Sequence, residues 1–295
     1  MGRNLLSVNN LTINQIEEIL LRAQFFQDNK DDLSITQLYK NKFVINFFLE
    51  PSTRTRFSFE IAEKRLGCRV INFQSNDSSI KKGESLYDTL KTLEVQGIDA
   101  AVIRIREEDV LENLSQKLSL TIVNAGEGIK EHPTQALLDL YTIRKYFKEL
   151  KGLNVAIIGD VAHSRVARSN YNLLKNYGVN FIYSGPNELM AEDLEGRYLS
   201  VDEAIKQADV VMMLRIQLER QNNSYTNLHE DYNKKYGFTT ERLQYLQSHA
   251  IILHPAPVNR GVEMDDDVVE HKQSKIFEQM NNGVWIRMAV IEKAI

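Results

Sequence analysis

Short apolar runs alternate with amphipathic stretches along most of the 295-residue chain, which leaves few folds open to it. Eight runs have the length and composition of buried strands, and helical patterns separate nearly all of them. The expected strands span residues 42–49, 69–73, 100–105, 120–124, 154–158, 180–183, 210–215 and 250–253. The expected helices include residues 84–95, 133–147, 164–177 and 201–207. This alternation predicts an α/β fold with parallel sheets and helices on both faces.

The strands fall into two sets of four, which predicts two parallel-sheet α/β domains. The chain is long for a single domain, and 43% hydrophobic residues is enough for two packed cores. The boundary is expected near a helix over 134–150, which ends in a plausible C-cap at Gly152. We therefore expect a first domain of residues 1–134, joined by a C-terminal helix at about 276–295, and a second domain of 135–275.

Two local patterns refine this outline. Thr12 followed by Gln15 forms a capping box, so the first helix is expected to begin there. The expected apolar face of that helix consists of Ile13, Ile16, Leu20 and Ala23. Residues 219–236 are polar and predict a long loop, and long loops are often functional.

Charge and cysteine content exclude several classes of protein. The net charge is −4 and the sequence has no long basic run, which argues against nucleic acid or membrane surfaces as partners. Cys68 is the only cysteine, so a disulfide within the chain is impossible, which fits a reducing compartment. Zinc-ligand spacing is absent, and no apolar run approaches the roughly 20 residues that span a bilayer. We expect a cytoplasmic protein without a metal or cofactor.

The segment S-T-R-T-R at 52–56 lies where the first expected strand gives way to a helix. A helix N-terminus offers unpaired backbone N–H groups and about half a positive charge. Hydroxyl donors and guanidinium groups at that position favour a phosphate site. The alternative is an N-cap Ser or Thr followed by solvent-exposed arginines.

Most of the other expected strands also end in Arg or His. Ligands of open parallel sheets bind at the carboxyl ends of the strands. The residues at the ends of these strands or after them include Arg104, His132, Gln135, Arg165, Arg215, Gln217 and the run H-P-A-P at 254–257. This concentration predicts a small ligand with several negative charges. For His132 alone a structural role is the alternative, and Gln135 one turn later favours function.

Other enzyme classes find less support. Gly159-Asp160 follows a strand, but the G-x-G-x-x-G pattern of dinucleotide sites is absent. The G-x-S-x-G pattern of serine hydrolases is absent too. The loop S-x-x-K-K-G-E at 78–84 reads equally well as a solvated turn.

Taken together, the motifs resemble those of the aspartate/ornithine carbamoyltransferase superfamily. The resemblance rests on S-T-R-T-R, S-x-x-K-K-G-E, H-P-T-Q-A-L-L-D, L-R-I-Q-x-E-R and H-P-A-P-V-N-R-G, which follow the family's order from residue 52 to 261. Ornithine carbamoyltransferases typically carry H-C-L-P where this chain has H-P-A-P. Arg165 and the segment 215–217 resemble the aspartate-binding residues of aspartate carbamoyltransferase catalytic chains. The resemblance implies an active site in the cleft between the two α/β domains.

The resemblance assigns the carbamoyl phosphate site to nine residues. They are Ser52, Thr53, Arg54, Thr55, Arg104, His132, Gln135, Ala256 and Pro257. Arg54, Thr55, Arg104 and His132 are expected to be catalytic. Gln135 and the backbone carbonyls of Ala256 and Pro257 are expected to bind the carbamoyl NH2. Many relatives have Leu at the position of Ala256, which a backbone contact should tolerate.

The resemblance also implies where aspartate binds and how the chains assemble. Aspartate would bind Lys82, Arg165, Arg215 and Gln217. Ser78 and Lys82 would come from a neighbouring subunit, so that a homotrimer shares its active sites. Separate regulatory chains and further stacking of trimers both stay open at this point.

The implied reaction is carbamoyl transfer from carbamoyl phosphate to L-aspartate, an early committed step of pyrimidine (UMP) biosynthesis. Thr55, Arg104 and His132 would stabilise a tetrahedral intermediate, and Arg54 would aid the departure of phosphate. The family uses no metal and no covalent intermediate, and the leaving phosphate is the expected acceptor of the amine proton. The alternatives are a carbamoyltransferase for another amino acid and a non-catalytic anion-binding paralogue.

Overall fold

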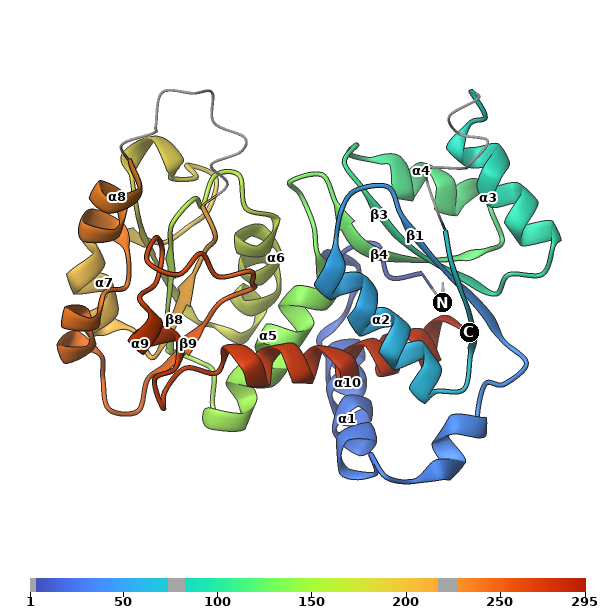
Figure 1. The fold of residues 1–295 in the computed structure, drawn as a ribbon, viewed down its shortest axis with the longest axis horizontal. Coiled ribbons are helices and arrows are strands. Elements are labelled where there is room, and N and C mark those ends of the chain that lie inside the picture. Colours follow the sequence, from blue (N-terminus) through green and yellow to red (C-terminus); the bar gives the residue numbers. More distant parts are fainter. Residues whose placement is uncertain (1–3, 74–82, 217–227) are drawn as a thin grey trace. The chain divides into compact units, whose positions relative to one another are not determined.

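The structure is a computed structural model that describes residues 4–73, 83–216 and 228–295. The chain forms two compact units, Met1–Leu138 with Asn281–Ile295, and Asp139–Met280. The division falls inside two helices, α5 (Pro133–Tyr146) and α10 (Ile276–Ala294) (Figure 1). Each unit contains one parallel sheet, so the α/β class predicted from the alternation of strands and helices is confirmed.

The sheet of the first unit has the strand order β2-β1-β3-β4, and all pairs are parallel. Its strands are β1 (Phe43–Phe48), β2 (Arg69–Asn72), β3 (Ala100–Ile105) and β4 (Thr121–Glu127). Its helices are α1 (Ile13–Asp28), α2 (Thr53–Arg65), α3 (Leu86–Val95) and α4 (Val110–Lys117), with short 3-10 turns at Val8–Asn10 and Leu33–Gln37. Strands β1, β3 and β4 are almost wholly buried, as expected for parallel strands covered on both faces.

Helix α1 begins as its capping box predicts. The Gln15 amide donates to Thr12 Oγ1 at 3.3 Å, and the Thr12 amide donates to Gln15 Oε1 at 2.9 Å. Ile16, Leu20 and Ala23 are buried, but Ile13 at the first helical position is 48% exposed. The predicted apolar face was therefore wrong at its first residue.

The sheet of the second unit has the order β7-β6-β5-β8-β9, again with parallel pairs. Its strands are β5 (Asn154–Ile158), β6 (Asn180–Ser184), β7 (Arg197–Tyr198), β8 (Val210–Met213) and β9 (Ile251–Leu253). Its helices are α6 (Arg165–Leu174), α7 (Val201–Gln207), α8 (Leu228–Tyr236) and α9 (Asp266–Val269), with 3-10 turns at Lys175–Tyr177, Asn187–Leu189 and Thr240–Tyr245.

Two predictions for the second unit were wrong. Strand β7 is absent from the expected set of four, because two residues are too short to show an alternating pattern. The expected loop over 219–236 ends in a helix, α8, at Leu228. This helix is mostly polar, but Tyr232 is buried and its ring lies 5.4 Å from that of Tyr236.

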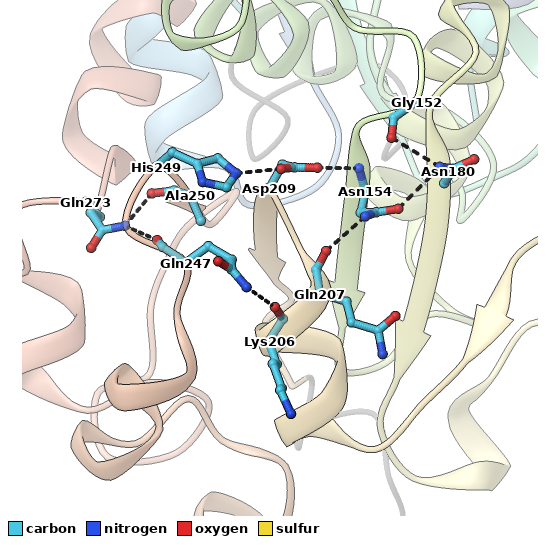
Figure 2. A network of polar contacts seen from close by, with 10 residues as sticks. All are labelled: Gly152, Asn154, Asn180, Lys206, Gln207, Asp209, Gln247, His249, Ala250 and Gln273. Atoms are coloured by element: carbon cyan, nitrogen blue, oxygen red, sulfur yellow. Dashed lines mark hydrogen bonds and ion pairs between the residues drawn. The ribbon is translucent and has the colours of Figure 1, made fainter.

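A polar network ties together the amino ends of four strands in the second sheet, β5, β6, β8 and β9 (Figure 2). The Asn154 amide, at the start of β5, donates to Asp209 Oδ2 at 2.7 Å. His249 Nε2 lies 2.6 Å from Asp209 Oδ1, so the same carboxylate joins the segments that lead into β8 and β9. This edge of the sheet is thus occupied by structural contacts, whereas the predicted site residues follow the carboxyl ends.

Candidate active site

The S-T-R-T-R segment forms the start of helix α2, directly after β1. Ser52 is the N-cap residue with extended backbone (φ −158°, ψ 95°), and its side chain makes no capping hydrogen bond. The first turn of α2 contains no acidic residue. Thr53 and Arg54 are exposed, and Thr55 is half-buried. The N-terminal positive end of this 13-residue helix is therefore uncompensated by its own cap, which suits an anion.

Arg104 lies beside this helix start because β1 and β3 are neighbours. In the parallel register Phe48 is paired with Arg104, and the Leu49 amide donates to the Arg104 carbonyl at 2.9 Å. Arg104 Nε donates to Glu50 Oε1 at 2.5 Å, and Arg106 Nε lies 3.9 Å from the other Glu50 oxygen. Glu50 is buried. Its carboxylate thus orients the Arg104 guanidinium at the carboxyl edge of the sheet.

His132 and Gln135 are brought to the same edge by β4, the neighbour of β3. His132 immediately precedes α5, whose first residue is Pro133, the residue type preferred at that helical position. The Gln135 amide donates to the His132 carbonyl at 2.9 Å, and both side chains are buried. Three adjoining strands of one sheet therefore collect the α2 start, Arg104, His132 and Gln135.

Strand β4 is longer than predicted and ends at Glu127 rather than at residue 124. Glu127 Oε1 accepts hydrogen bonds from the Val110 and Leu111 amides at 2.8 and 2.9 Å, which caps helix α4. Burial of Glu127 raises the pKa of its carboxyl, although these two amides oppose the shift. Glu127 therefore has a structural role.

The second unit repeats the arrangement on strands β5, β8 and β9, which are neighbours in its sheet. Arg165 is the first residue of α6, and Ser164 caps that helix by accepting from the Ala167 amide at 3.1 Å. Arg215 is half-buried and lies two residues beyond β8. Ala256 and Pro257 follow β9. The structure thus places these predicted residues at one edge of the second sheet.

Three predicted residues, Ser78, Lys82 and Gln217, lie outside the described residues. Among the residues that the structure does describe, no group of three or more His, Cys, Asp or Glu side chains could hold a metal ion. No helix in the same ranges combines the length and the apolar character needed to cross a membrane.

Glu50 and the residues that contact the H-P-A-P segment were not predicted from the sequence. A lone Glu between a buried strand and an arginine-containing helix start was a usable signal for Glu50. His254 is buried next to Glu263, with His254 Nε2 and Glu263 Oε1 3.3 Å apart. Nothing in the sequence indicates that these two side chains meet.

Fold and site together define a two-unit α/β protein whose parallel sheets both carry cationic and hydrogen-bonding side chains at their carboxyl edges. Residues 3–145 match the family described as aspartate/ornithine carbamoyltransferase, carbamoyl-P binding domain. Residues 151–293 match the Asp/Orn binding domain of the same family. The chain belongs to the aspartate/ornithine carbamoyltransferase family, as its motifs indicated.

Relatives with high similarity are aspartate carbamoyltransferase catalytic subunits. The subunit of Listeria monocytogenes is 47% identical over 292 residues, which cover 98% of this chain and 95% of the relative. That of Listeria welshimeri is 46% identical over the same shares. A crystal structure of aspartate transcarbamoylase from Trypanosoma cruzi in complex with carbamoyl phosphate has a TM-score of 0.89 and 29% identity. The match covers 98% of this chain and 95% of that structure.

Proposed function

We propose that the protein transfers the carbamoyl group of carbamoyl phosphate to the amine of L-aspartate, which yields N-carbamoyl-L-aspartate and phosphate. The observation that carries the proposal is the placement of the motif residues at the carboxyl edges of three adjoining strands in each sheet. Family membership and relatives that are aspartate carbamoyltransferases support the same reaction. The product would serve pyrimidine biosynthesis.

The first unit would bind carbamoyl phosphate. The phosphate would accept hydrogen bonds from the amides and hydroxyl groups at the start of α2 and an ion pair from Arg54. Thr55, Arg104 and His132 would donate to the carbamoyl oxygen. The Glu50 carboxylate on Arg104 Nε supports this role, because a fixed guanidinium loses little freedom when the substrate binds.

The second unit would bind aspartate and complete the carbamoyl site. Arg165 and Arg215, with Gln217, would bind the two carboxylates of aspartate. Arginines at these positions favour aspartate over ornithine, whose side chain carries an ammonium group. Gln135 and the carbonyls of Ala256 and Pro257 would accept from the carbamoyl NH2.

Transfer would proceed by direct attack. The aspartate nitrogen forms a bond to the carbamoyl carbon, and the electron pair of the C=O bond moves onto the oxygen. The donors to that oxygen stabilise its charge, and each such donor typically contributes about 3–4 kcal/mol. The C–O bond to phosphate then breaks, and the leaving phosphate takes the amine proton.

Assays with carbamoyl phosphate and a panel of amino acids test the choice of acceptor. Turnover with aspartate and none with ornithine is the expected result. Turnover of ornithine without turnover of aspartate would instead identify a carbamoyltransferase for another amine. Binding of carbamoyl phosphate with no turnover of any amine would identify a non-catalytic paralogue.

We also propose that three chains form a homotrimer in which Ser78 and Lys82 complete the site of a neighbour. Exposed apolar side chains on α2 and on the edge strand β2 support self-association: Phe57, Ile61 and Ile71 are 47%, 46% and 40% exposed. Helix α2 and strand β2 are in contact, and Asn72 Nδ2 donates to Glu60 Oε2 at 3.2 Å between them. A cytoplasmic location stays a prediction, and regulatory chains and assembly beyond the trimer stay open.

Mixing two inactive variants tests the shared site. Arg54→Ala and Lys82→Ala chains are expected to be inactive alone and to regain part of the wild-type activity as hybrid trimers. Recovery follows because a hybrid contains some sites with both intact residues. Verified hybrids without recovery would exclude a role of Lys82 across the subunit interface.

A further inference from the structure

His254 is enclosed at the carboxyl end of β9, where the loop that carries Ala256 and Pro257 begins. Its backbone amide donates to Gln279 Oε1 at 3.0 Å. Its ring Nδ1 accepts from the Ala256 amide at 2.8 Å. An accepting Nδ1 requires the proton of a neutral imidazole to be on Nε2. The His254 ring therefore has a defined tautomer and holds the Ala256 peptide directly.

Glu263 lies beside the His254 ring and holds the far end of this loop. The carboxylate is fully buried, and its Oε1 lies 3.3 Å from His254 Nε2. The same oxygen accepts from the Asn259 amide at 2.6 Å. A buried carboxylate is costly unless it is compensated by such contacts. The loop from His254 to Asn259 is thus fixed at both ends by two side chains that make no predicted contact with substrate.

A chain of buried hydrogen bonds also supports the backbone amide of His254. Gln279 Nε2 donates to Asp139 Oδ1 at 2.6 Å, and Asn170 Nδ2 donates to Asp139 Oδ2 at 2.8 Å. Gln279, Asp139 and Asn170 are all buried. They lie on α10, α5 and α6, so three helices hold the amide of His254 through one hydrogen-bonded chain.

The backbone of Ala256 has an unfavourable conformation that these contacts stabilise. Its φ is +56°, a left-handed conformation that non-glycine residues rarely adopt. Such a conformation persists only when the surrounding structure imposes it, and it is often found at functional sites. The contact that restrains this peptide most directly is the hydrogen bond from the Ala256 amide to His254 Nδ1.

We propose that His254 and Glu263 are positioning residues that aim the Ala256 and Pro257 carbonyls at the carbamoyl NH2, and thereby make the site select a carbamoyl phosphate over an acyl phosphate. The proposal rests on the proposed function. Acetyl phosphate has a methyl group where carbamoyl phosphate has NH2, so it cannot donate to the two carbonyls. Sites built to hydrogen-bond a group discriminate strongly against an analogue that lacks it.

The test compares the dissociation constants of carbamoyl phosphate and acetyl phosphate, measured by calorimetry on wild type and variants. In His254→Leu, the preference for carbamoyl phosphate should fall about 10- to 30-fold, while acetyl phosphate binds as in wild type. In His254→Asn, the side-chain oxygen can still accept from the Ala256 amide, so part of the preference should return. Glu263→Gln keeps the volume and should show a smaller fall, about threefold.

Asp209→Asn is the matched control, because it weakens the polar network at the amino ends of the same sheet (Figure 2). It should lower thermal stability without changing the preference. An unchanged preference in the folded His254 and Glu263 variants would overturn the inference, and so would an equal loss of affinity for both ligands. Wild-type protein that binds both ligands equally would overturn it too, whereas wild-type protein that does not bind carbamoyl phosphate would contradict the proposed function. If His254→Leu does not fold, Glu263→Gln and His254→Asn decide.

Discussion

Glu50 Oε1 accepts a hydrogen bond from Arg104 Nε at 2.5 Å, and the two side chains are only 6% and 14% exposed. The pair joins the segment after β1 to the end of β3, at the edge where helix α2 begins. Pairs of this kind combine charge with fixed geometry, so the guanidinium is oriented before a ligand arrives. Arg104 can then act as a donor to the carbamoyl oxygen with little reorganisation.

Loss of this donor should mainly slow the chemical step. Arg104→Ala is expected to lower kcat about 10²- to 10³-fold, as for other donors to a developing oxyanion. Glu50→Gln keeps the shape but removes the charge, and kcat/KM should fall about tenfold through poorer orientation. Steady-state kinetics with both substrates measures each effect. Arg106→Gln is the control, since Arg106 Nε lies 3.9 Å from Glu50 and its side chain is 74% exposed. A Glu50→Gln enzyme with wild-type kinetics would refute the orienting role.

Arg215 should act on aspartate rather than on carbamoyl phosphate. A charge-assisted hydrogen bond contributes about 1.5–3 kcal/mol, so Arg215→Ala should raise the KM for aspartate about 10- to 150-fold. The affinity for carbamoyl phosphate should change little, because the residues proposed to bind its phosphate belong to the first unit. Kinetics with each substrate varied in turn separates the two effects. Arg197→Gln, on the exposed edge strand β7, should leave both constants unchanged. An equal rise for both substrates would contradict the assignment.

Glu63 makes the stability depend on pH. Burial raises the pKa of this carboxyl from its ordinary value of 4.5 to about 8, and the hydrogen bond from Asn46 Nδ2 at 2.7 Å only partly opposes the shift. The folded protein therefore keeps the proton between these pH values while the unfolded chain releases it. The stability contributed by the protonated group is complete below about pH 4.5 and is lost progressively toward pH 8.

Replacement by the neutral isostere Gln should remove this loss. Glu63→Gln is expected to raise the free energy of unfolding by about 3 kcal/mol at pH 7 and to change it little at pH 4. Urea unfolding across this pH range measures the difference. Glu60→Gln is the control on the same helix, because the hydrogen bond from Lys64 lowers the pKa of Glu60. A Glu63→Gln protein with the same pH dependence as wild type would refute the account.

Gly67 is required for two separate reasons. Its φ is +85°, and a Cβ added there would lie 2.1 Å from the backbone carbonyl oxygen of Thr36. Gly97 has a similar φ of +92°, but a Cβ there would meet nothing within 4 Å. Gly97→Ala should therefore cost about 1 kcal/mol from its conformation alone. Gly67→Ala should cost about 3 kcal/mol or more, measured by thermal or urea unfolding. Similar costs for both variants would show that the close contact at Gly67 is relieved easily.

The order of strands and helices was predictable because buried parallel strands form continuous apolar runs, as in β1 and β5. The placement of the proposed site residues at the carboxyl ends of strands was predictable because ligands of such sheets bind there: Arg104 lies at the end of β3, and His132, Arg165 and Arg215 follow strands. Strand β7 was not predicted because its two residues are too few to show an alternating pattern. Helix α8 was not predicted because a mostly polar helix shows only a weak apolar periodicity. The contacts of Glu50 and Glu263 were missed because they depend on how separate segments meet, which local sequence does not specify.

The proposed reaction joins a carbamoyl carbon to the nitrogen of aspartate. Incubation of the wild-type protein with carbamoyl phosphate labelled with carbon-13 and aspartate labelled with nitrogen-15 tests it by NMR. We expect a product signal split by direct carbon–nitrogen coupling, with one phosphate released for each product molecule. Phosphate release without a coupled product, or a coupled product only when labelled ornithine replaces aspartate, would contradict it.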